Sequence, residues 1–235
     1  MLAKDLSYIF QDPGSSLNPA LRVGSQMTEG PVARGEITRK DSRSLAAQRL
    51  ADVHISAPGD RLRQYPFELS GGMKQRVMIA TALLGQPKLI IADEPTTALD
   101  VTVQAQVLRL LQEMNTRFGT AIILVSHNLA VVANTCSRIV VMYAGRIVED
   151  GTAEQVITKP RHPYTRALIG AIPDIDGDVN QPLVAIPGAI LEPDVGAVGC
   201  AFADRCPLAF DRCRIERPPL VGVGSRVACW LEGAE

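Results

Sequence analysis

Short apolar runs alternate with longer, helix-spaced segments along the first part of the chain. Residues 6–10, 89–92 and 120–125 predict strands, and the last two are continuous apolar runs of the kind found in buried parallel strands. The segments between them, 23–84 and 101–117, predict helices. Strands that alternate with helices in this way indicate an α/β fold with a largely parallel sheet.

Shorter elements are expected after residue 126. Residues 129–135 predict a short helix, and residues 139–143 and 146–149 predict a hairpin with a two-residue turn. Thr152 and Gln155 have the spacing of a capping box, which predicts the start of another helix.

The pattern changes near residue 168, where helical periodicity fades and prolines recur (Pro173, Pro182, Pro187, Pro193, Pro207, Pro218 and Pro219). We therefore predict two domains, residues 1–160 and residues 161–235. Residues 23–85 form a helical subdomain of the first domain, and we interpret their many charges as a solvated surface with no chemistry before Ser70.

Composition excludes several classes of protein. The chain has 235 residues, 46% of them hydrophobic, and no apolar segment approaches the roughly 18 residues that a membrane span needs. The first residues do not resemble a signal peptide. The formal net charge is −1 with no basic block, so nucleic-acid binding is not expected. We expect a cytoplasmic protein whose membrane association comes through partner proteins.

Ser70, Gly71 and Gly72 precede an apolar segment, residues 73–84, that predicts a helix. A helix start with a hydroxyl and two glycines offers unpaired backbone N–H groups and the positive end of the helix dipole, which suit a phosphate. The alternative is an ordinary serine N-cap before a core helix.

Polar side chains follow the three predicted strands of the first domain. Gln11 follows the first strand, Asp93 and Glu94 follow the second, and His127 follows the third. Open α/β sheets bind ligands at the carboxyl ends of their strands, so we expect these side chains to form one site. Taken singly, each is also compatible with an ordinary solvated or hydrogen-bonded polar residue.

These motifs resemble those of ATP-binding-cassette (ABC) proteins. The signature sequence is matched by residues 68–76 (Glu-Leu-Ser-Gly-Gly-Met-Lys-Gln-Arg), and the Walker B motif by residues 89–95. The resemblance covers nearly the whole chain and is closest to the ATPase subunits of bacterial peptide importers. It implies a P-loop NTPase fold, here a partial cassette, with ATP and Mg²⁺ as ligands.

The resemblance implies a role for each residue at the strand ends. Asp93 would hold Mg²⁺, through water, because magnesium retains several waters and takes few carboxylates. Glu94 would orient and polarise the attacking water, and His127 would bind the γ-phosphate, so both are predicted to be catalytic. Gln11 would contact the magnesium and the water.

The resemblance also implies nucleotide contacts from the signature and the D-loop. Ser70, Gly71, Gly72 and Gln75 belong to the signature, which completes the ATP site of a second cassette. Asp100 belongs to the D-loop, residues 96–100, and is also a candidate N-cap for the helix that follows.

The sequence departs from the ABC pattern because it contains no phosphate loop, G-x-x-x-x-G-K-[ST]. None of its five lysines is followed by Ser or Thr. Our interpretation is a truncated subunit that neither binds nor hydrolyses ATP appreciably by itself, so whether it is an enzyme stays open. The alternative is a non-catalytic assembly partner that lends its signature to another subunit's ATP site. A third hypothesis, an ABC ATPase unconnected with transport, is disfavoured by the C-terminal region.

The C-terminal region resembles the extension of oligopeptide, dipeptide and nickel importer ATPases, including the turn at residues 186–188. Four of the five cysteines lie there: Cys200, Cys206, Cys213 and Cys229. Four thiolates suit an iron–sulfur cluster or zinc, but the C-x-x-C pairs typical of zinc sites are absent. Resemblance to cluster-bearing members favours [4Fe–4S] over zinc. The alternative is a set of reduced thiols that pack a small lobe.

The resemblance also implies partners. These are a second ABC ATPase subunit, identical or different, two membrane permease subunits, and indirectly an extracytoplasmic substrate-binding protein. The chain would then sit at the cytoplasmic face of the membrane. The cargo stays open: it is a dipeptide, a longer peptide, nickel or another small solute.

Overall fold

The computed structural model describes residues 5–97, 99–172, 186–188 and 198–232. The chain forms two compact units, residues 1–127 and residues 128–235. The sequence analysis predicts a domain boundary near residue 160 from composition, and that boundary stays a prediction. Three prolines of the C-terminal region, Pro173, Pro182 and Pro193, lie outside the described residues.

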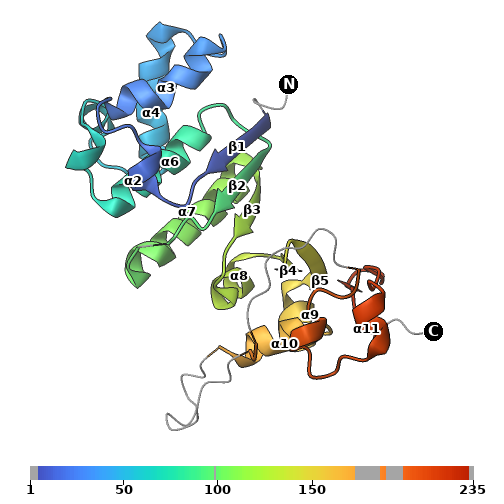
Figure 1. Ribbon diagram of the computed structural model, residues 1–235. Helices are drawn as coiled ribbons and strands as arrows, with labels where there is room; N and C mark the ends of the chain where they lie inside the picture. The colour runs from blue at the N-terminus through green and yellow to red at the C-terminus, as the bar shows by residue number, and fades with distance from the viewer. Residues whose placement is uncertain (1–4, 98, 173–185, 189–197, 233–235) are drawn as a thin grey trace. The chain divides into compact units, whose positions relative to one another are not determined.

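The first unit contains a three-stranded parallel sheet in the order β1-β2-β3 (Figure 1). The strands are β1 (Leu6–Ile9), β2 (Leu89–Asp93) and β3 (Ala121–Val125). Each lies where the apolar runs predict it, and the parallel pairing confirms the α/β fold.

The predicted helical region 23–84 is confirmed as several separate helices. The longer ones are α3 (Val23–Ala33), α4 (Arg39–Asp52) and α6 (Gly71–Ala82), with α2 (Pro13–Ser16), α5 (Pro58–Arg61) and the 3-10 helix Pro66–Glu68 between or before them. Helices α3 and α4 lie side by side (Figure 1). Helix α7 (Val101–Phe118) ends at Gly119, whose φ of +65° suits a residue without Cβ.

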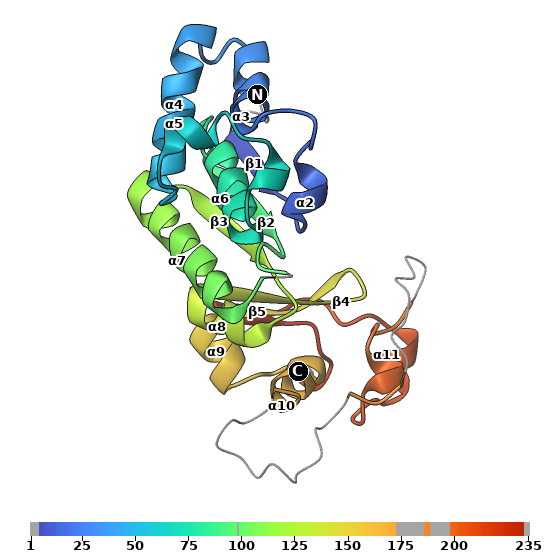
Figure 2. The same cartoon turned by 90° about the vertical axis from the view of Figure 1, so that its left-hand side faces the viewer.

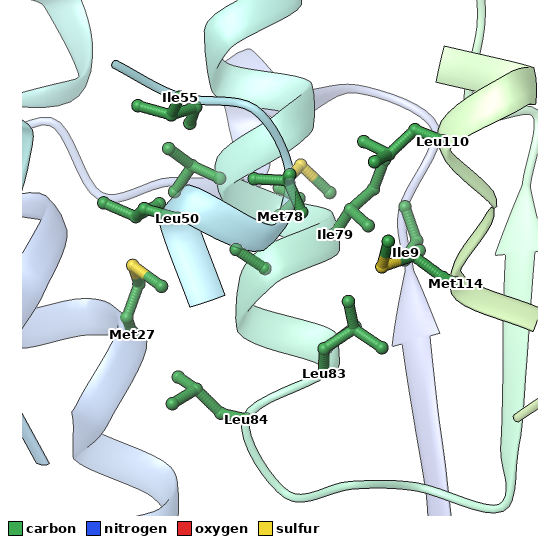
Figure 3. Close-up of a cluster of buried hydrophobic side chains, with 14 of the residues drawn as sticks. Ile9, Met27, Leu50, Ile55, Met78, Ile79, Leu83, Leu84, Leu110 and Met114 are labelled. Atoms are coloured by element: carbon green, nitrogen blue, oxygen red, sulfur yellow. The ribbon is translucent and has the colours of Figure 1, made fainter. Parts of the chain in front are cut away.

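One face of the sheet carries the hydrophobic core. Figure 3 shows Ile9 of β1 near Leu110 and Met114 of α7, with Ile79 of α6 and Leu83, the C-cap of that helix, beside them. The predicted burial is confirmed for residues 89–92, which are all buried or half-buried, but is wrong for residues 120–125, where Ile123 and Val125 are exposed. Helices α6 and α7 cover a single face, and the opposite face leaves large apolar side chains exposed: Leu6, Tyr8, Ile123 and Val125.

Two of the many charges in residues 23–85, which we interpret as a solvated surface, are instead buried. Arg49 and Asp52 of α4 are both buried and form an ion pair of 2.9 Å. Arg117 of α7 reaches the other oxygen of Asp52 at 2.8 Å. A buried charge requires such partners, which a single sequence does not reveal.

The second unit is built around an antiparallel sheet, β4 (Arg138–Tyr143), β5 (Arg146–Thr152) and β6 (Arg226–Val227). Its helices are α8 (Leu129–Thr135), α9 (Ala153–Thr158), α10 (Pro163–Gly170), the 3-10 helix Ala203–Arg205 and α11 (Asp211–Ile215). Helix α9 packs against β4 and β5 (Figure 2). The predicted hairpin and the capping box at Thr152 are both confirmed.

Two buried carboxylates on β5 organise this unit. Asp150 is paired with Arg138 at 2.6 Å and with Arg226 of β6. Glu149 accepts the backbone N–H groups of Arg161 and His162 at 2.8 and 2.9 Å. The strand thus holds the segment that leads into α10. No helix in the described ranges is long and apolar enough to cross a membrane.

Candidate functional site

The carboxylate of Glu94 receives three hydrogen bonds at the carboxyl end of the parallel sheet. Gln11 donates from Nε2 at 2.8 Å, and Thr97 donates from Oγ1 at 2.8 Å. Nδ1 of His127 lies 2.8 Å from the other carboxylate oxygen. The structure therefore brings together Gln11, Glu94 and His127, three of the four strand-end residues that the sequence places at one edge. Thr97 is a partner that sequence reasoning missed.

The backbone of Glu94 is in the left-handed region, with φ of +43°. Its N–H donates to the carbonyl of Val125 at 2.9 Å, which ties the end of β2 to the end of β3. A non-glycine residue in this conformation carries a backbone strain of order 1–3 kcal/mol, which is typical of functional sites. The hydrogen bonds from His127 and Thr97 hold the pKa of Glu94 below its usual value. The carboxylate is therefore anionic at neutral pH.

Asp93 has a different partner. The hydroxyl of Tyr8 donates to Oδ2 of Asp93 at 2.7 Å. In the parallel register Tyr8 is opposite Ile91, so its side chain is on the same face as that of Asp93, two residues further along β2. Sequence reasoning missed Tyr8 because alternation along a strand gives the face of each residue but not the register with its neighbour.

The signature residues occupy the start of α6, which packs against the start of α7. Ser70 is the N-cap, and its hydroxyl accepts the N–H of Met73 at 3.3 Å. A Cβ at Gly72 would lie 2.7 Å from Cγ1 of Val103, whereas a Cβ at Gly71 would meet Leu99 at an ordinary 3.7 Å. Gly72 is thus needed for helix packing, independently of any ligand.

Two further predicted site residues have clear structural positions. Asp100 is the N-cap of α7, and its carboxylate accepts the N–H of Val103 at 2.9 Å. Gln75 is 1% exposed, on the buried side of α6. Within the described part of the chain, neither amide atom of its side chain has a hydrogen-bond partner. The helix start, not Gln75, is the exposed part of the signature.

The chemistry at the sheet edge fits magnesium in a nucleotide complex. Over the described residues, no group of three or more His, Cys, Asp or Glu side chains is spaced to hold a metal ion alone. Mg²⁺ in nucleotide sites is held by one or two carboxylates together with phosphates and water, so a cage of protein ligands is not required. The partly exposed carboxylate of Asp93 and the amide of Gln11 are suitable oxygen donors.

Four cysteines of the second unit line one small cavity of about 20 Å³, together with His162 (Cys200, Cys206, Cys213 and Cys229). Burial raises the pKa of the thiols of Cys200, Cys206 and Cys229. All five cysteines are free thiols, and Cys136 lies outside this cavity. The metal site predicted for these four cysteines stays a prediction. Their spacing in the described residues is not that of a bound metal.

The turn at residues 186–188, predicted from the resemblance, is held by one side chain. Arg205 donates to the carbonyl oxygens of Pro187 and Ile186 at 2.8 and 3.0 Å. Gly188 has φ of +81°, which favours glycine.

Comparisons with known proteins agree with this arrangement. Residues 1–97 match the family model "ABC transporter", and residues 148–213 match "Oligopeptide/dipeptide transporter, C-terminal region". The solved structure of cbiO1 from Clostridium perfringens, part of an ABC transporter complex, superposes with a TM-score of 0.59 and 29% identity. The superposition covers 67% of this chain and 61% of the cbiO1 chain. A dimeric ATP-binding cassette with ADP and phosphate gives a TM-score of 0.54 at 28% identity, covering 64% of each chain.

Curated relatives are similar over nearly the whole chain. A probable peptide ABC transporter ATP-binding protein of Sinorhizobium fredii is 47% identical over 96% of this chain and 68% of its own length. The oligopeptide transport ATP-binding protein AppD of Bacillus subtilis is 46% identical over 98% of this chain and 72% of its own. The dipeptide transport ATP-binding protein DppD of Escherichia coli is 46% identical over 94% and 67%.

The fold is that of an ATP-binding cassette. Within that class, the chain belongs to the family of ATP-binding proteins of oligopeptide and dipeptide ABC transporters. It spans 67–72% of the length of these three relatives.

Proposed function

We propose that the chain acts as an ATP-hydrolysing subunit of a peptide-importing ABC transporter. The observation that carries this proposal is the carboxylate of Glu94, held by Gln11, Thr97 and His127 at the carboxyl end of the sheet. An ionised carboxylate fixed by three donors can accept a proton from a water molecule without turning away from it. The similarity to peptide transporter proteins supports the substrate class.

The residues at the strand ends have separate tasks in this proposal. Asp93 and Gln11 hold Mg²⁺, which when bound neutralises charge on the phosphates. Glu94 orients the attacking water and takes its proton, and His127 holds Glu94 and donates to the γ-phosphate. Ser70, Gly71, Gly72 and Asp100 belong to the face that completes the ATP site of a second cassette, whereas Gln75 is buried behind that face.

The phosphate-binding part of this site is not supplied by these 235 residues, which contain no phosphate-loop motif. A phosphate loop supplies a lysine and a row of backbone N–H groups to the β- and γ-phosphates. The 235-residue chain has no such motif, so by itself it neither binds nor hydrolyses ATP appreciably. The proposed partners are a second ATPase subunit and two membrane permeases at the cytoplasmic face, with a substrate-binding protein delivering cargo.

The alternative is a non-catalytic partner that contributes only its signature face. Ser70 caps an exposed start of α6, and this geometry is independent of Glu94.

The test is ATP hydrolysis by the complex of this chain with its permeases and a second ATPase subunit. If the chain is catalytic, the fold-decrease in turnover caused by Glu94→Gln should be at least about ten times that caused by Thr97→Ala. Turnover unaffected by Glu94→Gln, but abolished by changes at Ser70, would favour the alternative.

For the C-terminal lobe we propose a [4Fe–4S] cluster, in preference to zinc. The four cysteines that line one cavity support it, since four thiolates are the usual ligands of such a cluster. The thiols must lose their protons and move closer together to bind it, because their present spacing is not that of a metal site. The absorbance spectrum of anaerobically purified protein, with iron and zinc analysis, tests this. Protein free of both metals would indicate thiols that only pack the lobe.

A further inference from the structure

The two neighbouring acids at the end of β2 have separate supports. Glu94 is held by Gln11, Thr97 and His127, whereas Asp93 accepts the hydroxyl hydrogen of Tyr8 at 2.7 Å. Tyr8 and Asp93 are 85 positions apart in the sequence and meet because β1 pairs with β2.

We propose that Tyr8 is a positioning residue for magnesium, acting through the carboxylate of Asp93. The inference rests on the proposed function, because it assumes that Asp93 serves the metal. Because the phenol hydroxyl donates a hydrogen bond to Oδ2, it restricts rotation of the carboxylate about the Cβ–Cγ bond of Asp93. The second oxygen, Oδ1, is then presented in one orientation.

The strength of this contact makes the effect measurable. A hydrogen bond from a neutral donor to a carboxylate is stronger than a bond between neutral groups. Magnesium demands near-ideal octahedral geometry, so a ligand or water acceptor that rotates freely binds it less well. Calcium accepts more flexible surroundings, so its binding depends less on such a support.

The ring of Tyr8 is itself held in place. The centroid of Phe10 lies 4.7 Å from that of Tyr8, on the same face of β1. Tyr8 is nonetheless 42% exposed, so shortening it to phenylalanine removes a hydroxyl without opening a cavity in the core. The loss of the hydroxyl therefore changes the support of Asp93 and little else.

The neighbouring Ser7 offers a matched control. Its hydroxyl donates to the carbonyl of Ala82 at 2.9 Å, on the opposite face of the same strand. Ser7→Ala and Tyr8→Phe each delete one hydroxyl and one hydrogen bond from adjacent residues of β1. Only the second deletion touches Asp93.

The test uses the assembled transporter, with ATP hydrolysis measured against free Mg²⁺. We expect Tyr8→Phe to raise the half-saturating Mg²⁺ concentration about tenfold, while the rate at saturating Mg²⁺ stays near that of the wild type. Ser7→Ala should leave both quantities unchanged. Unchanged Mg²⁺ dependence in Tyr8→Phe, an equal change in Ser7→Ala, or a lower maximal rate at unaltered Mg²⁺ dependence would overturn the proposal.

A second measurement separates this proposal from the proposed function. Binding of Mn²⁺, followed by electron paramagnetic resonance with ADP present, needs no turnover. Weaker Mn²⁺ binding by Tyr8→Phe in a complex that hydrolyses no ATP would support the role of Tyr8 while the proposed function fails. Equal Mn²⁺ binding by the two proteins, or none by the wild type, would overturn the role of Tyr8.

Discussion

Nδ1 of His127 lies 2.8 Å from Oε1 of Glu94, and the two residues come from the ends of different strands. His127 follows β3, and its side chain is largely exposed, whereas Glu94 follows β2 and is mostly covered. The contact lowers the pKa of Glu94 and fixes one of its two oxygens. The histidine thus acts on the carboxylate directly, through a contact within the protein.

Replacing His127 by alanine should separate binding from hydrolysis. In the assembled transporter we expect His127→Ala to lower ATP turnover by a factor of about 10² or more, since positioned acid–base groups contribute that much. ATP binding should persist, because the phosphates are held mainly elsewhere. The matched variant Thr97→Ala, which also removes one donor to Glu94, should cost less because Thr97 lies in the same loop as Glu94. Wild-type turnover by His127→Ala would contradict this role.

The two signature glycines should respond differently to alanine. At Gly72 a Cβ would lie 2.7 Å from Val103, a branched side chain that cannot move aside easily. We expect Gly72→Ala to destabilise the first unit by about 1–3 kcal/mol, the usual cost of overpacking. Gly71→Ala has room and should stay within about 0.5 kcal/mol of the wild type. Urea unfolding followed by far-ultraviolet circular dichroism measures both, and equal stability of the two variants would contradict the packing role of Gly72.

The sequence predicts the first unit well where local pattern decides the structure. The runs at β2 and β3, the caps at Ser70 and Asp100, and the meeting of Gln11, Glu94 and His127 all follow from periodicity and from the geometry of parallel sheets. In each case the information lies within a few residues or in the shared direction of the strands.

The sequence fails where a contact depends on register or on distant packing. Tyr8 reaches Asp93 because of the pairing between β1 and β2, and Val103 excludes a side chain at Gly72 because two helices meet there. The buried pair of Arg49 and Asp52 likewise has a contact from Arg117, 65 positions beyond Asp52. From amino-acid type alone, Arg49 and Asp52 are expected to be solvated.

Asp52 is the residue on which the buried charges of α4 depend. Its two oxygens accept from Arg49 at 2.9 Å and from Arg117 at 2.8 Å, and both guanidinium groups lie against the ring of Phe118. We expect Asp52→Asn to destabilise the first unit by about 3 kcal/mol, because it leaves the buried Arg49 without its counter-charge.

Arg117→Ala provides the control for this prediction. The side chain of Arg117 is 57% exposed, whereas that of Arg49 is 6% exposed. Loss of an exposed partner should cost about 1 kcal/mol or less. Circular dichroism in urea follows both variants. Equal destabilisation by Asp52→Asn and Arg117→Ala would contradict the prediction that the buried Arg49–Asp52 pair stabilises the first unit more than the exposed Arg117 contact does.

His162 should make the stability of the second unit depend on pH. Burial, assisted by the nearby Arg166, lowers the pKa of His162 from 6.5 to about 4. Above pH 6.5 the ring is neutral in both states. Between pH 6.5 and 4 the unfolded chain binds a proton that the folded chain does not, so the free energy of unfolding falls by about 3 kcal/mol in total as the pH is lowered. Below pH 4 both forms are protonated and this contribution stops changing.

The variant His162→Asn isolates that contribution in metal-free protein. The Nδ1 atom of His162 accepts the N–H of Tyr164 at 3.0 Å at the start of α10, and an asparagine oxygen can replace this cap. The single tryptophan of the chain, Trp230, lies in the second unit, where its indole donates to the carbonyl of Glu216 at 3.0 Å. Its fluorescence therefore reports unfolding of that unit. Between pH 6.5 and 5 the wild type should lose stability faster than His162→Asn, and parallel slopes would show that His162 is not the group responsible.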